Sequence, residues 1–353
     1  MIITIVAFLA VLALLIIAHE VGHFASAKAF KIKVEEFGLG FPPRLFGIKR
    51  GETLYSLNAV PLGGFTKMAG EEDPKVKGSF AGKGIGTRLI VLSAGSIMNA
   101  LLPVVLFSIA FMIPHNLVME PTVVQAVSPG SPAAVAGIEV GDTLLAVNGQ
   151  PLNNFSELQR AIQLNLGKEI TILVEHSDST TEDVRLIPRW KPPQGEGAIG
   201  IERNVKFALD NRSTISQHEP FWRAVPMGVS ECGEVFVLIK NEVLKWVTGA
   251  AIPQVTGPVG IAQITGEAAK AGVSPLLEFT GFISINLAII NILPLPALDG
   301  GRIAFVLLEW VRRGKRVSPK TEGLVHLIGF AMLMALILVI TYQDVIRIVS
   351  GGA

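Results

Sequence analysis

Four long apolar segments constrain the fold of this chain more than any other feature of its sequence. Each is close to the roughly 20 residues that a helix needs to cross a bilayer, and they lie at 2–29, 89–113, 276–298 and 325–342. Half of all residues are apolar and only 17% are charged, against about 25% in soluble domains. The sequence therefore predicts a multi-pass α-helical protein of the inner or plasma membrane, with four spans and the lipid bilayer as its solvent.

Charge and cysteine content exclude several other classes of protein. The chain has 30 Lys and Arg against 29 Asp and Glu, whereas a nucleic-acid binder normally shows a clustered basic face, so no nucleic-acid partner is expected. Cys232 is the single cysteine, which excludes an intrachain disulfide and a thiolate zinc site. Any metal must therefore be bound by His and carboxylate side chains.

Basic residues predict the orientation of the four spans. The connection 28–88 carries 11 Lys and Arg and the connection 302–323 carries six, whereas none precedes the first apolar segment. Because Lys and Arg accumulate in cytoplasmic connections, both connections are predicted to be cytoplasmic and both termini extracytoplasmic. The 162 residues of 114–275 then lie outside the cytoplasm, and charge in so long a loop has little effect on orientation.

Two alternatives would change this topology. The small residues at 25–27 resemble a signal-peptide cleavage site, but no basic residue precedes the apolar run. A fifth span at 221–247 would reverse the last two helices. That stretch has apolar residues at helical spacing, interrupted by Glu231, Glu234, Lys240, Glu242 and Lys245. It is therefore predicted to be an amphipathic helix on the membrane surface.

The stretch 114–205 is predicted to be a separate, small α+β domain outside the cytoplasm. Pro and Gly separate short alternating strands, and one helix is predicted at 155–166. A local signature resembles a circularly permuted bacterial PDZ domain: Ser131-Pro132-Ala133-Ala134-Val135-Ala136-Gly137-Ile138, then Gly141-Asp142 and Val147-Asn148-Gly149. The resemblance implies a groove beside Ile199, Gly200 and Ile201, where an extended peptide could add as a strand. A plug or spacer that binds no peptide is the alternative.

The motif His19-Glu20-Val21-Gly22-His23 carries the strongest chemical signal. On a helix, residues four apart share one face, so both imidazoles can bind one Zn²⁺ while Glu20 acts on a metal-activated water. Ionisable groups at the end of a membrane helix are costly unless they line a polar cavity. A functional role is therefore expected for this motif rather than a structural one.

A catalytic zinc site usually takes a third protein ligand, and Asp299 is the candidate. It follows the third span at the depth predicted for His19 and His23, near the cytoplasmic side. The segment 291–301 holds two prolines and two glycines, so the helix must break there; broken backbone at membrane depth is tolerated where it lines a cavity. A solvated carboxylate is the alternative. The remaining histidines are predicted at other depths: His115, His176, His218 and His326.

Together these features resemble the site-2 protease family of intramembrane zinc metalloproteases. HExxH lies in the first span, N-x-x-P-x-P-x-L-D-G follows the third, and a PDZ-like domain separates the second and third. The resemblance implies one Zn²⁺ per chain, bound by His19, His23 and Asp299, with Glu20 as catalytic base. It implies as substrates single-pass membrane proteins, such as anti-sigma factors, or remnant signal peptides. Some members have two PDZ domains, and this chain has room for one.

The resemblance also implies residues that contact the substrate. Asn291 is expected to hold the substrate backbone or the oxyanion. Asn99 is a second candidate, with close helix packing beside Gly95 and Ser96 as the alternative. In the first cytoplasmic connection, 45–48, 53–57 and 60–68 alternate like a β-hairpin and an extra strand.

In the family, a membrane-dipping β segment at this place pairs with the extended substrate, which assigns Gly63 and Gly64 to substrate binding. A solvated hairpin is the alternative. The segment 38–41 spells a PDZ-like loop, but it lies in this cytoplasmic connection, and we expect a glycine-rich turn there.

The sequence thus predicts four regions, namely 1–113 with the first two spans and the β-hairpin, the PDZ-like 114–205, the amphipathic linker 206–275, and 276–353 with the last two spans. The predicted activity is hydrolysis of peptide bonds within or near transmembrane segments, with the outer domain rejecting substrates whose ectodomains are intact. Two other classes compete with it. A zinc transporter would need several ligand clusters along a path, and a PDZ adaptor with structural zinc would have no use for a base such as Glu20.

Overall fold

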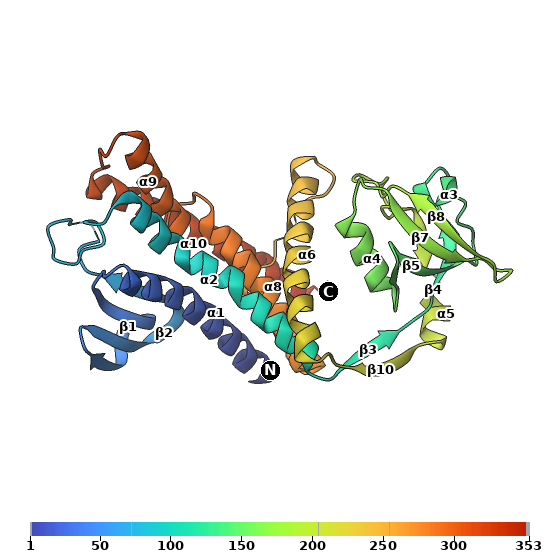
Figure 1. The fold of residues 1–353 in the computed structure, drawn as a ribbon, viewed down its shortest axis with the longest axis horizontal. Helices are drawn as coiled ribbons and strands as arrows, with labels where there is room; N and C mark the ends of the chain where they lie inside the picture. The colour runs from blue at the N-terminus through green and yellow to red at the C-terminus, as the bar shows by residue number, and fades with distance from the viewer. Residues whose placement is uncertain (1, 72, 204, 254, 351–353) are drawn as a thin grey trace. The chain divides into compact units, whose positions relative to one another are not determined.

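A computed structural model of the chain describes residues 2–71, 73–203, 205–253 and 255–350. Figure 1 shows the course of the chain. The helices are α1 (Ile2–Ala29), α2 (Ile85–Met112), α3 (Pro132–Val135), α4 (Phe155–Leu164), α5 (Val205–Asp210), α6 (Phe221–Val247), α7 (Pro258–Ala271), α8 (Val273–Ile292), α9 (Asp299–Val311) and α10 (Pro319–Val349). The strands are β1 (Val34–Arg50), β2 (Thr53–Met68), β3 (His115–Met119), β4 (Thr122–Val127), β5 (Thr143–Val147), β6 (Gln150–Pro151), β7 (Ile170–Glu175), β8 (Thr181–Leu186), β9 (Ile201–Arg203) and β10 (Ser213–Gln217).

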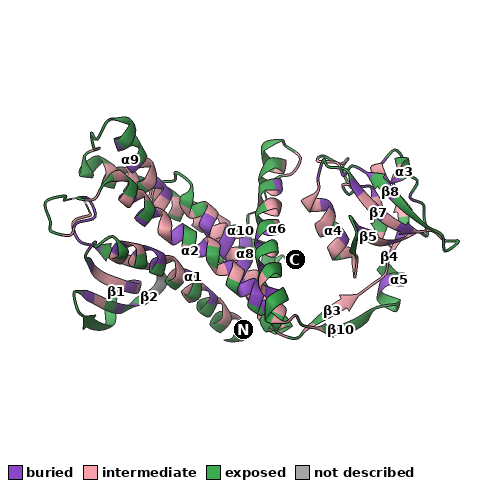
Figure 2. Cartoon of the chain, in the orientation of Figure 1, coloured by how far each residue is buried: buried purple, intermediate pink, exposed green. Residues whose placement is uncertain are grey.

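The chain forms two compact units. The first comprises Met1–Ala110, Phe221–Val229 and Val255–Ala353, and the second comprises Phe111–Pro220 and Ser230–Gln254. Within the described residues, four helices of the first unit are long and apolar enough to cross a membrane, namely α1, α2, α8 and α10. This finding confirms the four predicted spans. Large apolar side chains are exposed along α1, α2 and α10 (Figure 2), as expected for helices that face lipid.

The boundaries of the spans differ from the predicted ones where backbone chemistry overrides hydropathy. Helix α8 ends at Ile292, six residues before the predicted end at 298. Leu293 has extended backbone (φ −63°, ψ 144°), as expected before the proline at position 294, and a proline cannot donate the N–H that a helix needs. Helix α10 exceeds the predicted 325–342 at both ends; at its N-terminus, Ser318 caps the helix by accepting the N–H of Thr321.

Two helices of the first unit were not predicted. The glycine-proline pair at 257–258 indicated a turn, but Gly257 is the N-cap of α7 and Pro258 is its first residue. Proline is favoured at this position because its missing N–H would be unpaired there anyway. Helix α9 lies in the predicted cytoplasmic connection, and Asp299 is its first residue.

Strands β1 and β2 form a sheet whose long strands bend back on each other. Segment 34–39 lies between two parts of β2, because Leu39 pairs with both Gly64 and Leu57. Beyond it, 44–50 pairs with 53–58 as the predicted hairpin. The predicted turn at 38–41 is wrong, since these residues belong to β1. Register shifts beside Gly40, whose φ is +79°, give the bulge that a glycine permits.

The second unit is a β-rich, PDZ-like fold. Its main sheet has the order β8-β7-β5-β4-β9, with β6 paired to β5, while β3 and β10 form a separate two-stranded ribbon. Alternating residues of β7 are buried and pack in the core with Leu158 and Ile162 of α4. Helix α3 begins at a Ser-Pro pair: Ser131 Oγ accepts the N–H of Ala134, and Pro132 is the first helical residue.

Candidate metal centre

Two imidazoles and one carboxylate meet in the first unit. His19 and His23 lie one turn apart on α1, and their Nε2 atoms are 3.2 Å from each other. Asp299 Oδ2 lies 3.0 Å from Nε2 of His19 and 3.1 Å from Nε2 of His23. The structure thus brings together the three residues that the sequence singled out. Within the described part of the chain, no other group of three His, Cys, Asp or Glu side chains meets in this way.

The three donor atoms fit one zinc ion. Zinc bonds of about 2.0–2.1 Å in a tetrahedral site separate the ligand atoms by roughly 3.3 Å, and the observed separations are 3.0 to 3.2 Å. Two imidazoles with one carboxylate are the kind of ligand set that catalytic zinc sites use, with a fourth position left open. Both the spacing and the chemistry of the donors therefore suit a zinc site.

Helix α2 holds the rings of both histidines. His23 Nδ1 donates to the main-chain oxygen of Val91 over 2.8 Å, so the lone pair of His23 lies on Nε2, toward Asp299. Gly95 packs directly on the rings: a Cβ atom there would lie 2.8 Å from His19 Nε2 and even closer to His23 Nε2. Only a residue without a side chain leaves these ligand atoms in place.

Two asparagines approach the other ring. The Nδ2 atoms of Asn99 and Asn291 lie 3.4 Å and 3.5 Å from His19 Nδ1. Asn99 is 1% exposed, whereas Asn291, in the last turn of α8, is half-buried. Both candidates for substrate binding therefore lie beside the metal centre, but they differ in how accessible they are.

The broken segment after α8 positions Asp299. Ala297 has a left-handed backbone (φ +73°), which costs energy for a residue other than glycine, and its N–H donates to His326 Nδ1 of α10 over 2.9 Å. A Cβ atom on Gly301 would meet the main-chain oxygen of Leu295 at 2.5 Å. The predicted break is confirmed. His326 is thus not a ligand of the metal. It binds the broken segment that leads to the ligand Asp299, and the sequence did not reveal this contact.

Glu20 lines the same cavity as the three ligands, a space of about 310 Å³. Its side chain is buried, and its Oε2 accepts the hydroxyl of Thr66 in β2 over 2.7 Å. Gly64 lies against α1, since a Cβ atom there would be 2.9 Å from Glu20 Cγ. Gly63 (φ +100°) packs on the ring of Phe41 instead and does not line this cavity. The sequence did not single out Thr66.

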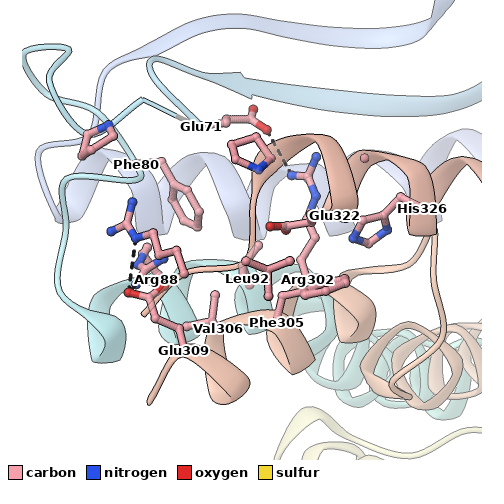
Figure 3. A pocket seen from close by; sticks show the side chains of 15 residues that line it. Glu71, Phe80, Arg88, Leu92, Arg302, Phe305, Val306, Glu309, Glu322 and His326 are labelled. Atoms are coloured by element: carbon pink, nitrogen blue, oxygen red, sulfur yellow. Dashed lines mark hydrogen bonds and ion pairs between the residues drawn. The ribbon is translucent and has the colours of Figure 1, made fainter. Parts of the chain in front are cut away.

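A second cavity of about 330 Å³ adjoins the first, since Glu71, Leu92 and Arg302 line both. Figure 3 shows two ion pairs in its wall. Arg302 lies three residues after Asp299 and binds Glu71 over 3.1 Å. Arg88 binds Glu309 over 2.7 Å, and both side chains are less than a tenth exposed. This buried pair joins the first turn of α2 to α9, the helix whose first residue is Asp299.

The remaining predicted residues lie in the second unit. Ile199 is buried in its core, and the main-chain oxygen of Gly200 accepts the N–H of Ser128 over 2.8 Å. Ile201 begins β9, which pairs with β4 and is an edge of the main sheet among the described residues. His176 lies in the same unit, 3.0 Å from Asp142 and 3.6 Å from Glu182. The hydrogen bond to Asp142 raises the pKa of His176 above its usual value.

Comparisons of the sequence with known proteins agree with the metal centre. Residues 7–336 match the family described as Peptidase family M50. A relative from Clostridium acetobutylicum that carries a zinc metalloprotease name is 38% identical over 94% of each chain. The regulator of sigma-W protease RasP of Bacillus subtilis is 28% identical, over 98% of this chain and 99% of its own length. That alignment spans 428 positions, so RasP has residues with no counterpart among the 353 here. A solved PDZ domain of the SdrC-like protein from Listeria innocua is 24% identical over 24% of this chain and 94% of its own, with a TM-score of 0.21.

Proposed function

The chain belongs to peptidase family M50, the intramembrane zinc metalloproteases that its motifs resemble, and on this premise we propose its substrates and the roles of its residues. It hydrolyses peptide bonds within or near the transmembrane segments of single-pass membrane proteins, such as anti-sigma factors, or of remnant signal peptides. The name of RasP as a regulator of sigma-W supports the first substrate class. The observation that carries the proposal is the meeting of His19, His23 and Asp299 in one cavity with Glu20.

His19, His23 and Asp299 would hold one zinc ion, which when bound polarises the scissile carbonyl and acidifies a water. Glu20 is the general base. Its Oε2 accepts the Thr66 hydroxyl, so Oε1 remains to take the proton of the attacking water and pass it to the leaving amine. Thr66 therefore positions the base by fixing one of its two oxygens.

The β2 segment 64–68 binds the extended substrate. It pairs on one side with 34–39, and its residues line the cavity that contains Glu20. Among the described residues no strand pairs with its other side, so its main-chain groups can receive a substrate strand. A transmembrane helix must unwind before hydrolysis, and pairing at this edge would compensate for the helical hydrogen bonds that it loses. Asn291 then holds the substrate backbone or the oxyanion.

The exposed apolar residues of the hairpin 44–58 support its place in the membrane. Leu45 is 69%, Phe46 61% and Ile48 57% exposed. Large exposed apolar patches mark contacts with a membrane or a partner. The hairpin 44–58 therefore dips into the bilayer.

The PDZ-like unit lies outside the cytoplasm, as do both termini, whereas the metal centre lies toward the cytoplasmic side. The basic residues of the two cytoplasmic connections support this orientation. The unit excludes substrates that still carry a folded ectodomain. No strand of the described residues pairs with the outer side of β9, which supports a groove for an extended peptide beside Ile199, Gly200 and Ile201.

Membership of a peptidase family removes the zinc transporter and the PDZ adaptor as leading alternatives. A transporter would need several ligand clusters along its path, and the described residues contain a single one. A structural zinc site in an adaptor would not require Glu20 in the cavity or the Thr66 hydroxyl that fixes it.

The test is cleavage of a single-pass substrate by the full chain in liposomes, with and without a zinc chelator. Glu20→Gln should lower the cleavage rate by about 10²–10⁴-fold while zinc content, measured by atomic absorption, stays at one ion per chain. Glu52→Gln is the matched control, because Glu52 lies outside the cavity and binds Lys28; it should cleave normally. Cleavage by Glu20→Gln at the wild-type rate would refute the assignment.

A further inference from the structure

The hydrogen bonds around His19 leave one buried oxygen, Oδ1 of Asn99, without a donor. Its Nδ1 faces two amide nitrogens, those of Asn99 and Asn291. Asn99 Oδ1 is buried and has no hydrogen-bond partner. A buried oxygen without a donor is costly and requires an explanation.

The chemistry of a bound imidazole changes the role of His19 Nδ1. A neutral imidazole has one N–H and one lone pair, and a metal on Nε2 takes the lone pair. Nδ1 then carries the proton and must donate, so it cannot accept from either amide NH₂ group. It needs an oxygen, as His23 Nδ1 has in the main-chain oxygen of Val91 at 2.8 Å.

Asn99 is the asparagine that can supply this oxygen. The O and N atoms of an amide exchange places when the side chain turns by about 180°, which would bring the unpartnered Oδ1 to His19 Nδ1. The backbone of Asn99 is fixed, since its main-chain oxygen accepts the hydroxyl of Ser284 in α8 over 2.7 Å. Asn291 is more exposed and lies where α8 ends, so it is free to turn toward a substrate.

We propose that Asn99 is a positioning residue whose Oδ1 accepts the Nδ1–H of His19 and so directs the His19 lone pair to the metal. The inference rests on the proposed function of His19 as a ligand, and it separates the two asparagines. Asn99, with 1% of its surface exposed, serves the metal centre, and Asn291 serves the substrate. The burial of Asn99 favours this role over contact with a substrate.

Two nearly isosteric variants of the full chain test the proposal. The metal-free protein in detergent is titrated with zinc against a chromophoric chelator, which measures affinity independently of cleavage. Asn99→Leu cannot accept and should bind zinc about 10–100-fold more weakly. Asn99→Asp accepts through a carboxylate, a common partner of zinc-bound histidine, and should stay within a few fold of wild type.

Asn286→Leu and Asn291→Ala serve as controls. Asn286 is half-buried on α8, donates to its own helix and lies outside the cavity of the metal centre, so Asn286→Leu should bind zinc normally. Asn291→Ala should also bind zinc normally while its cleavage of the test substrate slows. Thermal unfolding of each variant reports whether it is folded.

Three outcomes would overturn the proposal: wild-type zinc affinity in Asn99→Leu, an Asn99→Asp as weak as Asn99→Leu, or weak zinc binding in Asn291→Ala. The second would mean that His19 Nδ1 needs a donor or that Asn99 matters for packing alone. Failure of the proposed function would be a separate result. It would appear as normal cleavage by Glu20→Gln, and that outcome does not affect the zinc affinities measured for the Asn99 and Asn291 variants.

Discussion

Replacing Gly95 by alanine tests how closely α2 packs on the metal centre. Gly95 lies on the face of α2 that covers the rings of His19 and His23. An added methyl carbon would lie 2.7 Å from His19 Cε1 and 2.8 Å from His19 Nε2, with His23 Nε2 closer still. Carbon atoms rest at about 3.5–4.0 Å from their neighbours, so either the rings or the two helices must move by roughly 1 Å.

A movement of this size is large for a metal site. Ligand distances must stay within about 0.2 Å of their normal values, and the loss of a single group that orients a ligand already costs about 10–100-fold in affinity. Because the methyl group displaces both imidazoles, Gly95→Ala should weaken zinc binding at least about 100-fold. This factor corresponds to about 2.7 kcal/mol, at about 1.36 kcal/mol for each tenfold change.

Gly86→Ala is the matched control on the same helix. A Cβ atom at Gly86 would meet nothing within 4 Å, so this variant should bind zinc and cleave as wild type does. Both proteins are purified in detergent and titrated with zinc against a chelator, and their thermal unfolding is compared without metal. Wild-type zinc affinity in Gly95→Ala would refute the packing of α2 on the two rings. An equal loss in both variants would show an effect on the helix rather than on the ligands.

Three other contacts can be tested in similar ways. His326→Leu removes the acceptor of the Ala297 N–H and should weaken zinc binding about tenfold, at about 1–3 kcal/mol for an unpaired buried donor, whereas His326→Gln can still accept; equal affinities in the two variants would contradict this reasoning. Arg88→Met leaves Glu309 in a buried site with Arg316 as its remaining partner and should destabilise the fold by up to about 3–5 kcal/mol, measured by thermal unfolding; the double variant with Glu309→Leu should recover much of this loss, and no recovery would count against the pair. The raised pKa of His176 means that its protonated form stabilises the second unit fully below the ordinary pKa of about 6.5, and that this contribution is lost as the pH rises through the raised value. The unfolding temperatures of wild type and His176→Gln should therefore differ most in acid and converge in base, and a gap independent of pH would exclude the ion pair as its cause.

Hydropathy predicted the spans well because it measures which solvent a segment prefers. It failed at the end of α8, where Leu293, Leu295 and Leu298 prolong the apolar run to 298 although the helix ends at Ile292. The prolines at 294 and 296 interrupt the helical hydrogen bonds, and hydropathy does not register this. Helix α7 was missed for a related reason: a glycine followed by a proline is compatible with a turn and with the start of a helix.

The sheet of β1 and β2 depends on contacts that local sequence does not reveal. The 38–41 segment contains two glycines and looked like a turn, yet it is held in β1 by pairing with 64–65 on one side and 56–57 on the other. The contact of Thr66 with Glu20 likewise joins residues 46 positions apart. Such tertiary pairing overrides local propensity, so Thr66 could not be found from the sequence alone.

The environment of the metal ligands, by contrast, left a signal in the sequence. Val91, Gly95 and Asn99 lie four residues apart, on one face of α2, and α2 runs antiparallel to α1 in the predicted topology. The residues of α2 therefore face those of the HExxH motif in the opposite order along the chain: Val91 contacts His23, Asn99 contacts His19, and Gly95 lies between the two rings. The three positions nevertheless differ in what a sequence can reveal.

Position 95 must lack a side chain, and on our proposal position 99 must accept a hydrogen bond, so both constrain the type of residue. Position 91 contributes a main-chain oxygen, which any residue possesses, and its valine side chain is fully buried. Substitution there by another apolar residue should alter packing and leave the hydrogen bond to His23 intact. Because part of the ligand environment is main chain, the sequence can identify only the positions that require a particular residue type, here Gly95 and Asn99.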